Sequence, residues 1–213
     1  MAYPLQYQLT EYDCGPTSVI NALRLLFDRK LLHPDMIHGV YRYCMEGFNC
    51  HGEMGKTGTS RCAMHFLSQW FNQYAMQRHF PIHTEYLVEG DTYLHKGSPI
   101  EQTLRAGGCA LVRCHFGCEH YILLTGLCED GEHVYVFDPY YLEKKLRRRD
   151  IVPITDLPCR ANVMLPFDRL NREDRDYYAM GSRERRECVL FFNTAATQMP
   201  DLQISCAQSA AGR

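Results

Sequence analysis

The chain has 213 residues, of which 46% are hydrophobic and 23% are charged, the composition of an ordinary globular protein. Its formal net charge of −2 gives no overall attraction to nucleic acid or to an anionic membrane surface. No apolar run approaches the roughly 18 residues that a membrane-spanning helix needs. We therefore expect neither nucleic acid nor a membrane as a partner.

The cysteine usage points to a reducing compartment. Eleven cysteines are scattered along the chain without the regular spacing of a disulfide framework. The first residues lack the basic and apolar regions of a secretion signal. These features favour a cytoplasmic protein with free thiols, most of which serve as small packing residues.

The first informative stretch runs from Gln8 to Pro16. Apolar residues then recur at helical spacing from Pro16 to Phe27. Proline is tolerated in the first turn of a helix, so Cys14 and Gly15 are expected at the helix entrance.

A cysteine in this position is a candidate nucleophile. Unpaired N–H groups and the helix dipole favour the thiolate at a helix N-terminus. The amide of Gln8, brought back by the preceding loop, could donate a hydrogen bond to the oxyanion that forms when a thiolate attacks an acyl carbon. The alternative is a buried cysteine that opens an ordinary helix, and this stretch alone leaves both readings open.

Helices and loops dominate the next part of the chain. A short helix is expected over 33–43, followed by a glycine-rich loop over 46–58. Thr59 or Ser60 caps a helix that ends near His79 and carries a core-facing aromatic stripe. Ser98-Pro99 then begins a short helix.

Strand-like runs follow, and they indicate an α+β fold with an antiparallel sheet. The expected strands are 109–116, 120–127, 133–137, 160–167 and 188–193. Asp130-Gly131 predicts a hairpin between the second and third of these. We expect a single domain over 1–194 and a flexible tail over 195–213. A short basic run within 143–150 is flanked by acidic residues and lacks aromatic neighbours, which predicts a solvated surface.

His120 and Asp138 lie at the same end of the two strands joined by this hairpin. A nucleophilic cysteine needs a base, usually histidine, and the base needs an orienting group. A symmetric two-residue turn would place His120 opposite Tyr141, so an asymmetric loop or a bulge must shift the register before His120 and Asp138 can meet. The alternative is a strand-end histidine and a turn-forming Asp-Pro pair.

Together these residues resemble a known family. Gln8, the run Asp13-Cys14-Gly15-Pro16, His120-Tyr121 and Val136-Phe137-Asp138-Pro139 are similar to papain-like cysteine peptidases typified by the processing domains of bacteriocin (double-glycine) leaders. The resemblance spans roughly residues 5–141. It implies a papain-like fold, with N-terminal helices packed on a C-terminal antiparallel sheet.

The resemblance also implies the roles of four residues. Cys14 would be the nucleophile, His120 the general base, Asp138 its orienting group and Gln8 a donor in the oxyanion hole. The implied activity is hydrolysis of a peptide or amide bond through an acyl-thioester on Cys14, without cofactor or metal. The substrate would be a peptide, a protein or another amide. The chain lacks a nucleotide-binding motif, so we expect a stand-alone member of the family.

Three alternatives stay open at this stage. Relatives of this fold include acyltransferases and glutamine deamidases, which share the thioester intermediate. A second alternative is a catalytically inactive binding protein. The third is a zinc-binding module built from Cys109, Cys114, Cys118 and His120. The spacing of Cys109 and Cys114 argues against this module, because five steps along one strand place them on opposite faces.

Overall fold

The structure is a computed structural model that describes residues 3–143, 146, 148–196, 199–200 and 202. Most of the expected flexible tail over 195–213 therefore lies outside the described residues. The same is true of Lys144, Lys145 and Arg147 in the basic run.

Helices and strands alternate more than the sequence suggests. The α-helices are α1 (Cys14–Leu26), α2 (Pro34–Cys44), α3 (Arg61–Arg78), α4 (Pro99–Arg105) and α5 (Phe167–Asn171). The strands are β1 (Ile82–Val88), β2 (Cys109–His115), β3 (Glu119–Leu127), β4 (His133–Phe137), β5 (Val152–Pro153), β6 (Val163–Pro166) and β7 (Glu187–Asn193). Short 3₁₀ turns cover Arg29–Leu31, Glu89–Thr92 and Arg183–Arg185.

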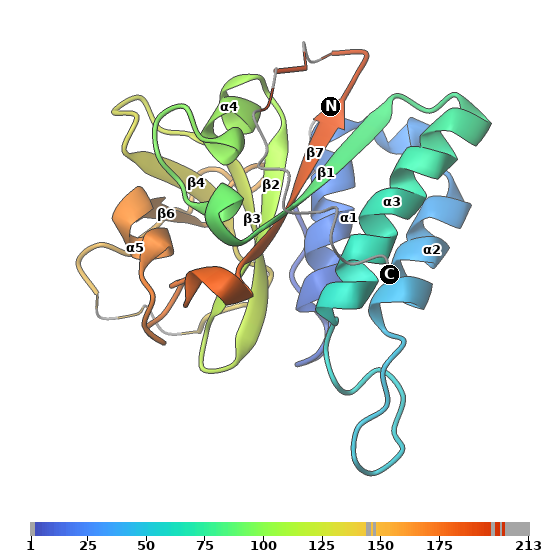
Figure 1. Ribbon diagram of the computed structural model, residues 1–213, viewed down its shortest axis with the longest axis horizontal. Coiled ribbons are helices and arrows are strands. Elements are labelled where there is room, and N and C mark those ends of the chain that lie inside the picture. Colours follow the sequence, from blue (N-terminus) through green and yellow to red (C-terminus); the bar gives the residue numbers. More distant parts are fainter. Residues whose placement is uncertain (1–2, 144–145, 147, 197–198, 201, 203–213) are drawn as a thin grey trace.

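The strands that the structure describes form one seven-stranded sheet in the order β1-β7-β2-β3-β4-β6-β5. Each neighbouring pair is antiparallel. The last strand, β7, lies between β1 and β2, so a C-terminal segment joins the edge strand β1 to the rest of the sheet (Figure 1). The mixed α+β class with an antiparallel sheet is confirmed.

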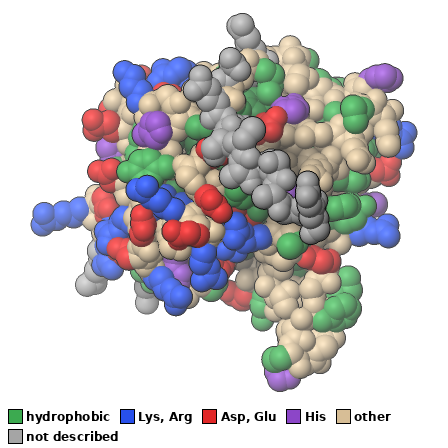
Figure 2. Space-filling view, in the orientation of Figure 1, with side chains coloured by type: hydrophobic (Ala, Val, Ile, Leu, Met, Phe, Trp, Pro, Cys, Tyr) green, Lys and Arg blue, Asp and Glu red, His purple; other side chains and the backbone are tan. Residues whose placement is uncertain are grey.

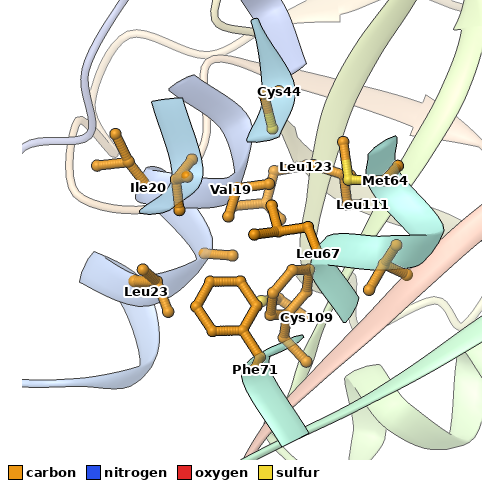
Figure 3. Packing of buried hydrophobic residues seen from close by; sticks show 14 of the residues in the cluster. Val19, Ile20, Leu23, Cys44, Met64, Leu67, Phe71, Cys109, Leu111 and Leu123 are labelled. Carbon is orange, nitrogen blue, oxygen red and sulfur yellow. The ribbon is translucent and has the colours of Figure 1, made fainter. Parts of the chain in front are cut away.

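One face of the sheet, called here the helical face, is covered by α1, α2 and α3 (Figure 1). Its core joins residues of these helices with residues of β2 and β3, as Figure 3 shows. The labelled core residues are Val19, Ile20, Leu23, Cys44, Met64, Leu67, Phe71, Cys109, Leu111 and Leu123. Burial of these side chains holds α1 in a fixed position on the sheet.

The other face, called here the opposite face, carries a second core. Alternate residues of β2 and β3, among them Val112 and Ile122, pack there with Leu104 of α4 and with Leu170 and Tyr178 from the C-terminal region. The period-two alternation of strand side chains divides the two cores. Accordingly, Cys109 belongs to one core and Cys114 to the other.

The predicted caps at the starts of α3 and α4 are confirmed. The side chain of Ser60 accepts a hydrogen bond from the N–H of Ala63 at the start of α3, and that of Ser98 accepts one from Glu101 at the start of α4. The expected long loop between α2 and α3 is present and projects from the body of the molecule (Figure 1). Within it, Phe48 forms an isolated bridge with Met54.

One strand prediction was too long, and one strand was not predicted. The expected strand 160–167 begins only at Val163, because the N–H groups of Arg160 and Ala161 donate to the carbonyl of Leu157 in a turn. The edge strand β1 was not expected, since its polar residues obscure the apolar alternation. Buried Thr84 occupies one inward position and is satisfied by hydrogen bonds to Ser68 and Asn72.

The surface in Figure 2 carries acidic and basic side chains side by side. In the C-terminal region, the buried side chain of Arg169 bonds both Asp150 and Asp176. Among the described residues, no helix combines the length and the apolar character needed to cross a membrane.

Candidate active site

Helix α1 begins at Cys14, as the position of Pro16 predicted. The first N–H groups of a helix have no intrahelical partner, and Pro16 carries none. The first intrahelical bond runs from the N–H of Thr17 to the carbonyl of Asp13 at 3.0 Å. The N–H groups of Cys14 and Gly15 therefore remain beside the cysteine as potential donors.

Asp13 folds the loop that precedes the helix. Its carboxylate does not cap α1 but accepts hydrogen bonds from the N–H of Leu9 at 3.2 Å, from the N–H of Thr10 at 2.8 Å and from the Thr10 hydroxyl at 2.7 Å. Asp13 is buried. The chain from Leu9 to Cys14 is thus a tight turn fixed by one carboxylate.

The segment before this turn lies along α1. The buried side chain of Asn21 accepts from the N–H of Gln6 and donates to its carbonyl, both at 2.8 Å. Arg24 donates to the carbonyl of Pro4 at 2.8 Å. Side chains of the helix therefore hold the strand-like segment that leads to Gln8.

The N-terminal end of α1 lies against β3, beyond the point where the pairing between β3 and β4 ends. Pairing between these strands ends at Leu123. Beyond that point the hydroxyl of Ser18 donates to the carbonyl of Tyr121 at 3.2 Å. On the other side, the N–H of Gln8 donates to the carbonyl of Pro139 at 2.8 Å. These bonds bring the helix entrance next to the expected base and its orienting group.

A β-bulge between Leu124 and Gly126 supplies the register shift that the sequence required. Below the bulge Leu127 pairs with Val134, and above it Leu123 pairs with Phe137. An isolated glycine within a strand is a known signal for a bulge.

The bulge places His120 and Asp138 on the same face of the sheet. Continued to the end of the strand, the shifted register would set His120 opposite Tyr140, two residues from Asp138. Residues two apart on a strand share a face, and such diagonal neighbours are within reach of each other. Without the shift, Asp138 would project from the other face.

The two side chains meet in a short, buried hydrogen bond. His120 Nε2 lies 2.7 Å from Asp138 Oδ1. The histidine is 4% exposed and the aspartate 2% exposed. Because Nε2 faces the carboxylate, Nδ1 is the ring nitrogen left for the thiol of Cys14, which also interacts with the ring.

These contacts decide the charge of His120. Burial lowers the pKa of the imidazole, but the charge and hydrogen bond of Asp138, together with the interaction with Cys14, outweigh burial and raise the pKa to about 10. The histidine is therefore an imidazolium at neutral pH.

Gln8 lies in the loop that precedes Cys14. Its Nε2 donates to the carbonyl of Thr10 at 2.7 Å. Its Oε1 is buried and has no hydrogen-bond partner in the described structure. The structure thus brings Cys14, His120 and Asp138 together, while the Gln8 side chain bonds Thr10 within the preceding loop.

A comparison with protein families matches residues 1–155 to the Peptidase_C39 like family. The chain belongs to that family. Membership indicates a cysteine peptidase-like protein, with peptides as the implied class of substrate. A search of curated proteins finds no match.

The family match ends before two residues that hold Asp138, and sequence reasoning missed both. The side chain of Asn162 accepts from the N–H of Asp138 at 2.8 Å and donates to its carbonyl at 2.7 Å. The hydroxyl of Tyr178 donates to Asp138 Oδ2 at 2.7 Å. Neither residue lies in a motif, so no local signal could have found them.

Two hollows lie beside the site of this C39-like chain. One, of about 220 Å³, is bordered by Asp138, Tyr141 and Ile154. The other, also of about 220 Å³, lies between Leu9, Thr17 and Tyr41. Tyr7 borders both. The linings are largely aromatic and aliphatic, as is usual where a protein binds small groups.

The zinc alternative finds no support in the described residues. There, no group of three or more histidine, cysteine, aspartate or glutamate side chains could hold a metal ion. Cys109 and Cys114 lie in the two separate cores, while Cys118 is exposed. The nearby histidine, His120, is occupied by Asp138.

Proposed function

We propose that the protein is a thiol-dependent hydrolase that cleaves a peptide or amide bond through an acyl-thioester on Cys14. His120 is the general base and acid, Asp138 orients its ring, and the whole arrangement is that of a papain-like peptidase. The observation that carries this proposal is the buried hydrogen bond between His120 and Asp138, together with the interaction of the His120 ring with Cys14 at the start of α1.

In the first half of the reaction, the Cys14 thiolate attacks the carbonyl carbon and forms a C–S bond. The negative charge that develops on the oxygen is held by hydrogen bonds. His120, an imidazolium before attack, gives its proton to the leaving amine as the C–N bond breaks. The product amine departs and the acyl group stays on Cys14.

In the second half, water attacks the thioester. Neutral His120 takes a proton from this water as the C–O bond forms. The C–S bond then breaks, which releases the carboxylic acid and restores the thiolate–imidazolium pair. Asp138 keeps the same ring nitrogen occupied throughout, so the other nitrogen always faces the reacting atoms.

Gln8 completes this proposal as an oxyanion donor. The N–H of Cys14 at the helix entrance supplies one donor. The Gln8 amide supplies the second once its side chain leaves the Thr10 carbonyl and turns toward the substrate oxygen. The buried, unpartnered Oε1 supports such a turn, because a buried polar atom without a partner disfavours the present rotamer.

The hollows beside the site support a peptide substrate. They lie on either side of Tyr7, next to the loop that carries Gln8. Their apolar linings suit the side chains that flank a scissile bond.

The test is to trap the acyl-enzyme. The wild-type protein and Cys14→Ala are incubated with a defined peptide library, quenched in acid and digested, and the peptide that contains residue 14 is weighed by mass spectrometry. We expect an acyl adduct on Cys14 and cleaved peptides from the wild type, and neither from the variant. Equal cleavage by both proteins would overturn the proposal.

A further inference from the structure

The segment after α5 runs back to the end of β2, beyond the residues that match the family. The N–H of Tyr178 donates to the carbonyl of His115 at 2.8 Å, and the N–H of His115 donates to the carbonyl of Ala179 at 2.8 Å. This reciprocal pair fixes the main chain of residues 178 and 179 against the strand that neighbours His120.

Tyr178 adopts an unusual backbone conformation there. Its φ of 64° lies in the left-handed region, which bulky residues rarely occupy. Such conformations persist where the surrounding structure holds them, and they cluster at functional sites. Here the backbone bonds to β2 hold the tyrosine while its side chain is 1% exposed.

The hydroxyl of Tyr178 points at the buried aspartate. It donates to Asp138 Oδ2 at 2.7 Å. Burial, the charge of Asp138 and this hydrogen bond raise the pKa of Tyr178 well above its ordinary value. The hydroxyl therefore stays protonated and remains a donor over the working range of most enzymes.

The contacts of Asp138 divide between its two oxygens. Oδ1 lies 2.7 Å from His120 Nε2 and accepts from the N–H of Tyr140 at 2.8 Å. Oδ2 accepts from Tyr178. The side chain of Asn162 fixes the main chain on both sides of the residue. Removal of the tyrosine hydroxyl would free one of the two oxygens and allow the carboxylate to rotate away from His120.

We infer that Tyr178 is a positioning residue of this site, acting on Cys14 through Asp138 and His120. The inference rests on the proposed function. The C-terminal segment is then a working part of the site, since it sets the orientation of the imidazolium that faces the thiolate.

The test is the pH dependence of Cys14 alkylation by iodoacetamide in Tyr178→Phe, followed by mass spectrometry of the peptide that contains Cys14. The ring of Tyr178 packs on Phe116, with centroids 5.2 Å apart, and phenylalanine retains that ring. A less well oriented imidazolium stabilises the thiolate less, so the midpoint of alkylation should move to higher pH by about 0.5 to 1 unit. An unchanged midpoint in a folded variant would overturn the inference.

Tyr177→Phe is the matched control. Its ring also packs on Phe116, at 5.0 Å, but its hydroxyl has no hydrogen bond to any residue that the structure describes. Its alkylation profile should match the wild type. An equal shift in both variants would show a general loosening of the segment and would overturn the positioning role.

A double-mutant cycle separates action through Asp138 from a structural effect. In an Asp138→Ala background, Tyr178→Phe should change the alkylation rate by less than about 2-fold, because the group it acts on is gone. If Tyr178→Phe shifted the pH midpoint of Cys14 alkylation in that background as much as it does when Asp138 is present, the inference would be contradicted. If the wild-type Cys14 alkylates no faster than an ordinary thiol, the proposed function itself fails. If the wild-type Cys14 is reactive and Tyr178→Phe alkylates with the same pH profile, only this inference fails.

Discussion

The two faces of the sheet supply different parts of the same site. The helical face supplies Cys14 from α1, which lies within the family match and packs chiefly on β3. The opposite face holds His120 and Asp138 in place with Tyr140, Asn162 and Tyr178. The first part is local in sequence, whereas the second is assembled from segments far apart in the chain. A nucleophile can thus be recognised from a short motif, but the group that orients its base cannot.

This contrast predicts that the opposite face controls the charge state of the site. In Asp138→Asn the charge that raises the pKa of His120 is gone and burial, which lowers it, prevails. We expect the His120 pKa to fall from about 10 by more than roughly two units, and peptide turnover to fall about 10³- to 10⁴-fold.

The measurement is a titration of the His120 ring by NMR, with His120→Ala used to assign its signal, together with turnover of a peptide found by acyl trapping. The raised pKa of His120 also fixes how this residue contributes to the free energy of unfolding. Its stabilising contribution is fully present below the unfolded-state pKa of about 6.5 and is lost as the pH rises through about 10. A His120 pKa that stays near 10 in the variant would contradict the prediction.

In the loop before α1, Gln8 is predicted to stabilise the oxyanion that forms in the transition state of acylation and to have no effect on the reactivity of the Cys14 thiol itself. Alkylation by iodoacetamide creates no oxyanion, whereas acylation by 4-nitrophenyl acetate does. Gln8→Ala should therefore slow acylation of Cys14 roughly 10²-fold, the usual effect of losing an oxyanion donor, and leave its alkylation rate unchanged. Stopped-flow release of nitrophenolate and peptide mass spectrometry measure the two rates. Equal slowing of both reactions would show that Gln8 only shapes the loop.

Much of the helical face could be predicted from the sequence because its signals are local. Pro16 located the helix entrance, and Ser60 and Ser98 marked two further helix starts. The need for a register shift between His120 and Asp138 also followed from residue counting. Its position at Gly126 did not, because a glycine in a strand is compatible with several local structures.

The rest of the site depends on distant contacts. Asn162 lies 24 residues and Tyr178 lies 40 residues from the aspartate that they bond. The sequence did not predict β1, because the inward-facing Thr84 is polar and its hydroxyl finds its hydrogen-bond acceptor only in the folded protein, at the carbonyl of Ser68 in α3. Polar residues of this kind carry no periodic signal until tertiary structure supplies their partners.

The central claim is that Cys14 is a thiolate held by the His120 imidazolium. The most direct measurement is the rate of iodoacetamide alkylation at about pH 6, where an ordinary thiol is roughly 0.3% ionised. Peptide mass spectrometry compares Cys14 with the exposed Cys50 and Cys118 in the same sample. We expect Cys14 to react at least about 10-fold faster in the wild type and to lose this advantage in His120→Ala. Equal rates for Cys14 and Cys50 in the wild type, or an unchanged Cys14 rate in His120→Ala, would contradict the account.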